Sequence, residues 1–328
     1  MINKLSMIIL GIMICLLGFG KEVFAELPSE FPTKPVKLIV PYGPGGAVDI
    51  TARILAKDLS SMWGQQVIVE NKPGAAGMIA ANTVAKSSPD AYTLLITDDG
   101  VLISMPQIQK NIPYDPLNDL LPIGMVCMFP YVIVTNPKTN IKSMNDFVSV
   151  AKGSQKGLDY ATNGVGSTHH LTWESFQKTA GIKLNHIPYK GAASALQDVV
   201  AGEVSLMIVA VSTALPFMKD GRLVPIAIGS LDRLSSIANV PTISESGYPG
   251  FEAIAWQGIL ASRGTPNTLI EKISNDLRKI TQSSSYKEAL ILRGTESRTS
   301  SALEMSRRIK VEFDKTSLLI KSLNIQLE

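Results

Sequence analysis

Short apolar runs alternate with segments of helical periodicity over the first part of the chain. Residues 36–40, 66–69 and 92–96 are apolar runs rich in β-branched side chains, and each leads into a loop that contains glycine. These runs are predicted strands. The segment between the first two repeats apolar side chains at the spacing of one helical face: Ile50, Ile54, Leu55, Leu59 and Met62. Such alternation predicts a parallel sheet covered by helices on both faces.

The same alternation returns further along and predicts a second α/β unit. Its predicted strands are residues 132–134, 158–161, 184–188, 204–211 and 223–228. Between them, residues 193–201 have the pattern of a short helix, with Gly202 as its C-terminal cap.

The last part of the chain is predicted to be mainly helical. Thr265-Pro266 is a helix start, with proline expected at the first helical position. Met305, Ile309 and Phe313 then give the last helix an apolar stripe. We expect these helices to pack back on the first unit.

The chain would then cross between the two units twice, near residues 128–131 and 250–256. This predicts a two-domain α/β fold with a two-stranded hinge, in which domain 1 is residues 26–130 plus 256–328 and domain 2 is residues 131–255. Ligands of open α/β sheets bind at the carboxyl ends of the strands, which in this layout face the interdomain cleft.

The N-terminus has the features of a secretion signal. Lys4 supplies a positive start, residues 7–19 form an apolar core, and the following segment ends in the small residue Ala25. A membrane-spanning helix needs about 18 apolar residues or more, and this core is shorter. We expect residues 1–25 to be a signal peptide cleaved after Ala25, which exports the mature protein.

Composition excludes several classes of partner. The chain has 31 basic and 28 acidic residues, a net charge of +3, with no basic stripe, so nucleic acid is not expected as a partner. After export only Cys127 remains of the 2 cysteines, and no intramolecular disulfide is expected.

Three predicted strands lead into a glycine-containing loop and then a helix, at residues 43–46, 74–77 and 163–168. Backbone amides at helix N-termini hold small anions without a dedicated arginine. The sequence therefore predicts an anion-binding cleft built from loops. Asp49 and Arg53 lie on one helical turn and are expected to pair, with Asp49 offsetting the helix dipole rather than contacting a ligand.

Enzymatic and metal chemistry have little support in the residues. Ser167, His169 and His170 follow a glycine loop, but the segment lacks the G-x-S-x-G pattern of a hydrolase nucleophile. A serine that caps a helix explains the same residues, so an exported hydrolase is the weaker alternative. The 3 histidines have no metal-ligand spacing, and we predict no metal and no cofactor.

Four segments of the chain, at residues 32–53, 69–77, 187–191 and 240–247, resemble in order the tripartite tricarboxylate transporter substrate-receptor (Bug) family. The resemblance implies a non-enzymatic periplasmic solute-binding protein of the type II, Venus-flytrap fold. Such a receptor captures a small organic acid, a di- or tricarboxylate or a related acid, and delivers it to the membrane permease of the transporter. The alternative partner is a membrane sensor kinase, for which the receptor would be a sensing subunit.

The resemblance also implies where the acid binds. The first glycine loop and the loop after the strand at 158–161 are the expected contacts, with the loop at residues 74–77, the end of the third strand and residues 210–212 as cleft walls. The candidate ligand-binding residues are Tyr42, Gly43, Gly45, Gly46, Gly74, Ala75, Thr97, Asp98, Asp99, Asn163, Gly164, Gly166, Ser167, Thr168, Ala210 and Ser212.

Asp98 and Asp99 differ from the small neutral residues more usual at this place in the family. An ionised aspartate repels a carboxylate ligand. One hypothesis is that either side chain meets an ammonium group or ring nitrogen of a zwitterionic or nitrogen-containing acid. The alternative is that both face solvent or cap the following turn.

Overall fold

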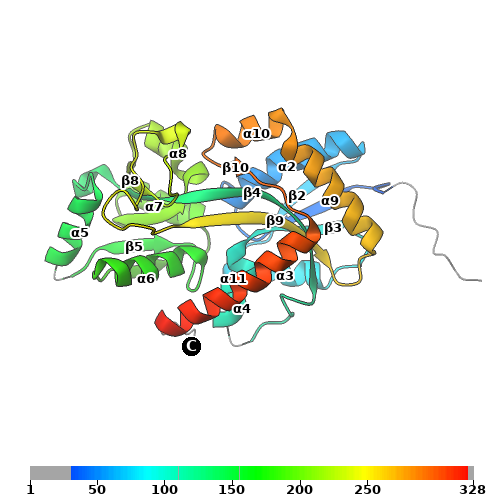
Figure 1. The fold of residues 1–328 in the computed structure, drawn as a ribbon, viewed down its shortest axis with the longest axis horizontal. Helices are drawn as coiled ribbons and strands as arrows, with labels where there is room; N and C mark the ends of the chain where they lie inside the picture. Colours follow the sequence, from blue (N-terminus) through cyan, green and yellow to red (C-terminus); the bar gives the residue numbers. More distant parts are fainter. Residues whose placement is uncertain (1–30, 110, 155, 324–328) are drawn as a thin grey trace, which may run out of the picture. The chain divides into compact units, whose positions relative to one another are not determined.

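The computed structural model describes residues 31–109, 111–154 and 156–323, and the chain from Pro32 onward forms one compact unit (Figure 1). The expected signal peptide, residues 1–25, lies outside the described residues. No helix in the described part of the chain is both long enough and apolar enough to cross a membrane.

The described strands join in one 10-stranded sheet. Its order is β2-β1-β3-β9-β4-β7-β5-β6, and β8 and β10 also pair with β4. The strands are β1 (Val36–Val40), β2 (Val67–Asn71), β3 (Thr93–Asp98), β4 (Leu120–Thr135), β5 (Asp159–Thr162), β6 (Asn185–Pro188), β7 (Leu206–Ala210), β8 (Val224–Ile228), β9 (Ile254–Ser262) and β10 (Glu296–Ser297).

The predicted parallel pairing is right for part of this sheet. β1 pairs in parallel with β2 and β3, and β5 pairs in parallel with β6 and β7. β4 and β9, the strands at the two expected crossings, pair antiparallel with each other. One strand carries the chain out of the β1–β3 region and the other brings it back, so they run in opposite directions.

Helices separate the strands as the periodicity predicts. They are α2 (Ala47–Trp63), α3 (Met78–Ala85), α4 (Met105–Ile108), α5 (Met144–Gly153), α6 (Thr168–Ala180), α7 (Ala192–Ala201), α8 (Val211–Lys219), α9 (Asn267–Gln282), α10 (Ser284–Ile291) and α11 (Ala302–Leu323), with single turns at η1 (Ala75–Gly77), η2 (Gly100–Ser104), η3 (Pro137–Thr139) and η4 (Ser235–Ile237). Gly202 caps α7 in a left-handed conformation, as predicted. Pro266 is the residue before α9 rather than its first helical residue, a correction of one position.

β4 changes partners in its middle. Up to Pro130 it pairs with β9, and from Tyr131 it pairs with β7 on one side. The Tyr131 amide also donates to the Ala253 carbonyl at 2.9 Å, just before β9 begins. The two segments expected to cross between units therefore lie side by side at this point (Figure 1). The division into domains at residues 26–130 plus 256–328 and 131–255 stays a prediction.

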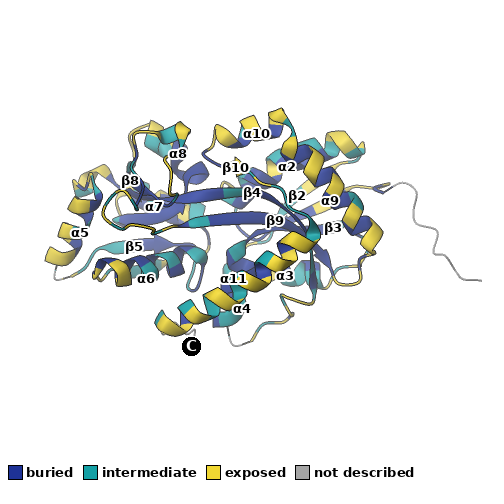
Figure 2. Cartoon of the chain, viewed as in Figure 1, coloured by how far each residue is buried: buried dark blue, intermediate teal, exposed yellow. Residues whose placement is uncertain are grey.

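Burial follows this arrangement. β4 and β9 are almost wholly buried, whereas the outward faces of α9, α10 and α11 are exposed (Figure 2). α9 and α10 contact α2, as expected for helices that pack back on the first unit. α11 does more than that, because Ile320 near its end packs with Ile108 and with Leu171 of α6. The last helix thus contacts both α4, which follows β3, and α6, which follows β5.

Candidate functional site

A cavity of about 320 Å³ lies between the loops that follow β1, β5 and β6. Its lining comes from strands and loops on both sides of the crossing and from the middle of β4. The lining residues are Tyr42, Gly43, Pro44, Gly46, Ala47, Val48, Pro73, Asp98, Phe129, Tyr131, Asn163, His169, Lys190, Gly191, Ala192, Ala193, Ser194, Val209, Ala210 and Thr213.

Two helices begin at this cavity. Gly46 is the N-cap residue of α2 and Gly191 that of α7, and no side chain in the described part of the chain caps either end. The first N–H groups of a helix have no acceptor within the helix. A Cβ atom built on Gly45 would lie 4.0 Å from the Cβ of Ala193, so the two ends face each other closely. This wall of the cavity presents backbone donors and two positive dipole ends to an anion.

Asp49 holds the first loop in shape. Its carboxylate accepts the Gly45 amide at 2.9 Å, the Arg53 guanidinium at 2.9 and 3.0 Å, and the Asn71 side-chain amide at 3.0 Å. Asn71 also donates to the Tyr42 carbonyl at 2.9 Å. Burial alone would raise the pKa of Asp49, but these hydrogen bonds lower it. The expected Asp49–Arg53 pair is confirmed.

A second wall of the cavity contains a buried carboxyl group. Asp98, at the end of β3, is 7% exposed, and its Oδ1 accepts the Tyr42 hydroxyl at 3.0 Å and the Val101 amide at 3.4 Å. Burial raises the pKa of Asp98 to about 6, although these hydrogen bonds lower it. The pKa of Tyr42 is raised by burial and by the neighbouring carboxyl, which keeps its hydroxyl a donor.

Three residues that line the cavity each have a buried polar atom without a hydrogen-bond partner among the described residues. These atoms are Asn163 Oδ1, His169 Nδ1 and Thr213 Oγ1. Burial lowers the pKa of His169 to about 3, so its ring is neutral, and it packs edge-on against Tyr131 with 4.9 Å between the ring centroids. A buried polar atom without a partner is costly, which makes these atoms candidates for contact with a ligand.

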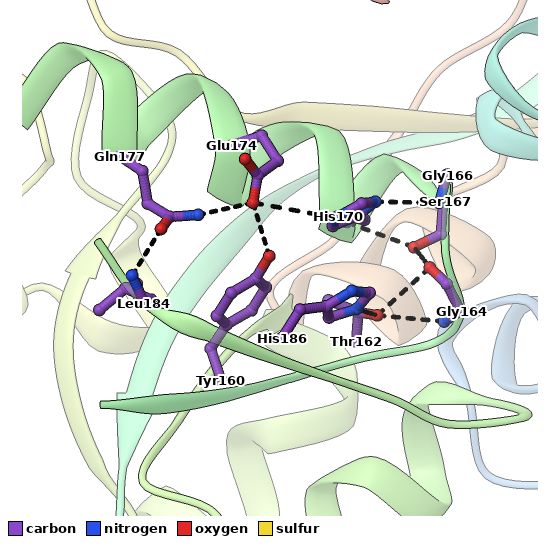
Figure 3. Close-up of polar contacts among 10 residues, drawn as sticks. All are labelled: Tyr160, Thr162, Gly164, Gly166, Ser167, His170, Glu174, Gln177, Leu184 and His186. Atoms are coloured by element: carbon purple, nitrogen blue, oxygen red, sulfur yellow. Dashed lines mark hydrogen bonds and ion pairs between the residues drawn. The ribbon is translucent and has the colours of Figure 1, made fainter. Parts of the chain in front are cut away.

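A polar network behind the cavity shapes the loop at residues 163–168 (Figure 3). His170 Nδ1 accepts the Gly166 amide at 3.0 Å. The Thr162 hydroxyl accepts the Gly164 amide at 3.2 Å and lies 2.6 Å from Nε2 of His186. These contacts fix the loop that carries Asn163.

The network continues along α6 to Glu174 (Figure 3). Its Oε1 accepts the Tyr160 hydroxyl and the Gln177 side-chain amide, each at 2.7 Å, and lies 3.8 Å from His170 Nε2. The His170 and His186 rings stack with 4.1 Å between their centroids. These histidines therefore have structural partners.

Ser167 is engaged in the same way. Its hydroxyl donates to the Gly164 carbonyl at 2.7 Å and accepts the His170 amide at 3.3 Å. It is the N-cap of α6, as the capping interpretation predicts. Neither histidine side chain accepts its proton, which is not the arrangement of a hydrolase nucleophile. No group of side chains suited to hold a metal ion occurs in the described parts of the chain.

The structure brings part of the sequence-derived candidate set into this cavity. The candidates that line it are Tyr42, Gly43, Gly46, Asp98, Asn163 and Ala210. They come from the loop after β1, the ends of β3 and β7, and the loop after β5.

The other candidates lie outside the lining. Gly45 lies beside the cavity, and its amide donates to Asp49. Gly164, Gly166 and Ser167 make the hydrogen bonds that shape the loop at residues 163–168. Thr97 and Ser212 are buried. Gly74 and Ala75 follow Pro73, which lines the cavity, but they are not among its lining residues. Asp99 and Thr168 line a separate cavity of about 390 Å³ together with Trp256 and Glu312.

Sequence reasoning missed most of the lining residues at the start of α7 and the aromatic side chains that β4 contributes. Lys190 and Gly191 belong to residues 187–191, one of the four segments that resemble the receptor family, so this segment could have indicated that they line the site. Phe129, Tyr131 and Thr213 carry no local signal, because they enter the cavity only through the pairing of β4 with β7 and the start of α8.

This chain is similar to known proteins over most of its length. The model of the tripartite tricarboxylate transporter family receptor matches residues 51–325. Protein BugT of Bordetella pertussis is 36% identical over 287 residues, which cover 87% of each chain.

Solved structures are also similar. R. palustris Rpa4515 with adipate has a TM-score of 0.88 at 31% identity, covering 90% of this chain and 99% of that one. The periplasmic binding protein BugD has a TM-score of 0.86 at 30% identity, covering 91% and 100%. MatC from Rhodopseudomonas palustris with bound malate has a TM-score of 0.83 at 25% identity, covering 88% and 100%.

Proposed function

Because this chain belongs to the tripartite tricarboxylate transporter receptor family, a family of periplasmic solute receptors rather than enzymes, we propose that it holds one small organic acid in the cavity between α2 and α7 and delivers it to the membrane permease of such a transporter. The similar structures named with adipate and malate support a carboxylate as the group recognised.

The observation that carries the proposal is the meeting of two helix ends at one cavity. Gly46 precedes α2, which follows β1, and Gly191 precedes α7, which follows β6. Neither helix start has a side-chain cap among the described residues. Hydrogen bonds to a charged group contribute roughly 1.5 to 3 kcal/mol each. Four or five such bonds are enough for micromolar binding, about 8 kcal/mol, after ordering costs.

Closure around the acid is part of the proposal. The two helix ends belong to segments joined through β4 and the start of β9, so opening at that crossing would separate them. A hinge motion of this kind would admit and release the acid. Export by cleavage after Ala25 also belongs to the proposal. No observation favours a sensor kinase as the partner.

Calorimetric titration with succinate, malate and adipate tests the site. Wild-type protein should bind at least one of them with micromolar affinity. Ala192→Asp places a negative charge in the first turn of α7, where it suits the helix but repels a bound carboxylate. We expect this variant to keep its melting temperature and to bind at least tenfold more weakly.

Ala192→Asn is the matched control, because it adds a side chain of the same shape without the charge. It should lose much less affinity than Ala192→Asp. Unchanged binding in Ala192→Asp would place the carboxylate elsewhere, and no binding of any acid by the wild type would contradict the proposed function.

A further inference from the structure

The cavity has two chemically different walls. One consists of the backbone donors at the starts of α2 and α7, which suit a carboxylate. The other includes the buried Asp98 carboxyl, with the Tyr42 hydroxyl bonded to it. A simple carboxylate satisfies the first wall and is repelled by the second when Asp98 is ionised.

Among the described residues, no cationic side chain compensates the charge of Asp98. The groups that act most strongly on it are burial, the Tyr42 hydroxyl and backbone amides, and no lysine or arginine of the described residues is among them. Lys190 lines the same cavity but is exposed. A desolvated carboxylate without a counter-ion is strongly unfavourable.

The neighbouring groups do not supply the missing charge. Burial and the Asp98 carboxylate raise the pKa of the adjacent Asp99, so that its carboxyl keeps its proton, and Glu312 and Arg308 of α11 act on Asp99. His169 of α6 is neutral, because burial lowers its pKa to about 3. Tyr131 of β4 keeps its proton, because burial and the two carboxyl groups raise its pKa.

Uncharged polar residues also line this cavity. Asn163 Oδ1, His169 Nδ1 and Thr213 Oγ1 are all buried and without partners among the described residues. Each of these side chains is less than 9% exposed, and each can accept a hydrogen bond. A hydrogen-bond donor with a positive charge fits an environment of several acceptors and one carboxylate.

We propose that Asp98 is the specificity-determining residue of the receptor, and that it selects amino-substituted organic acids, whose carboxylate lies at the two helix ends while their ammonium group pairs with the Asp98 carboxylate. This inference rests on the proposed carboxylate site and names its ligand class. It assigns the role to Asp98 rather than Asp99, which lines the other cavity.

A competing arrangement makes the opposite prediction for pH. If Asp98 were protonated, it would donate a hydrogen bond to the second carboxylate of a diacid, and diacids would bind more tightly as pH falls. An ammonium group requires the ionised form instead. With a pKa of about 6, Asp98 is mostly ionised at pH 7.5 and mostly protonated at pH 5.

Matched pairs of acids test the selection by calorimetric titration at pH 7.5. The pairs are L-aspartate with succinate, L-glutamate with glutarate, and 4-aminobutyrate with butyrate. In at least one pair the amino member should bind tenfold or more tightly than its partner. Lowering the pH to 5 should weaken that binding, since the ionised form of Asp98 is lost.

Asp98→Asn should remove both effects. It keeps the size and hydrogen-bonding capacity of the side chain but cannot ionise, so the amino member should lose at least tenfold in affinity while its partner keeps or gains affinity. Asp99→Asn is the matched control, one residue along the chain, and should keep the preference.

The outcomes separate this inference from the proposed function. Diacids that bind as tightly as or more tightly than their amino partners, and that lose affinity in Ala192→Asp, would overturn the inference and leave the carboxylate receptor standing. A preference for amino acids that persists in Asp98→Asn would overturn the role of Asp98. Absence of binding to every acid of the panel would overturn both proposals.

Discussion

At the scale of single residues, Gly229 shows how a missing side chain brings two segments together. Its amide donates to the Tyr131 carbonyl at 2.7 Å, and its carbonyl accepts the Ala253 amide at 2.8 Å. A Cβ atom at this position would lie 2.5 Å from the Ala253 carbonyl oxygen. Only glycine therefore lets the end of β8 join both segments where the chain crosses.

Gly229→Ala should destabilise the protein, because the new methyl group meets backbone rather than a movable side chain. Overpacking of this kind costs about 1 to 3 kcal/mol. Chemical denaturation followed by circular dichroism measures the change.

Gly153→Ala is the control for glycine replacement in general. Gly153 ends α5, and none of the described heavy atoms outside its immediate surroundings lies within 4 Å of its Cβ position. This variant should be neutral or stabilised by up to about 1 kcal/mol. Equal stability of the two variants would show that the crossing tolerates a side chain at residue 229.

At the scale of elements, α6 depends on histidines that stay neutral. Burial lowers the pKa of His169 and of His186 to about 3, and that of His170 is also lowered. The unfolded chain has histidine pKa values of about 6.5 and takes up protons first as pH falls. Stability from these residues is therefore present above about pH 6.5 and lost progressively toward pH 3.

His186→Phe should weaken this pH dependence. Phenylalanine can stack on Tyr160, whose ring centroid lies 5.0 Å from that of His186, but it cannot titrate. Melting temperatures between pH 7.5 and pH 5 should fall less steeply in the variant than in the wild type, whatever its stability at pH 7.5. Parallel curves would mean that His186 does not contribute to acid sensitivity.

At the scale of the whole molecule, the proposed opening motion depends on the approach of the first loop to α7. The Cβ position of Gly45 lies 4.0 Å from the Cβ of Ala193, within the range of about 3.5 to 4.5 Å that a disulfide requires. The native Cys127, the one cysteine of the described residues, is buried and unpaired, so it does not interfere.

The double variant Gly45→Cys/Ala193→Cys should therefore form a disulfide on oxidation and join the two helix ends. If the ends must separate for exchange, release of a bound acid should slow at least tenfold and recover on reduction. The two single variants are controls for strain at Gly45, whose φ is +84°. Failure to form the bond, or exchange at an unchanged rate in the oxidised protein, would contradict the proposed closure.

The sequence by itself determined the features that depend on neighbouring residues. The period of apolar side chains predicts strands such as β1 and β7. The backbone freedom of glycine predicts the cap at Gly202, and spacing within one helical turn predicts the Asp49–Arg53 pair. The resemblance of four short segments also identified the family, because their order along the chain is specific. The first glycine loop entered the candidate site on the same local grounds.

Tertiary structure alone decided which residues share the cavity. Asp98 and Asp99 are adjacent and chemically identical, yet they line different cavities, since successive side chains leave the end of β3 in different directions. Tyr131 joins the site because β4 leaves β9 and pairs with β7 at that residue. Contacts of this kind depend on strand pairing between distant segments, and no local pattern in the chain specifies them.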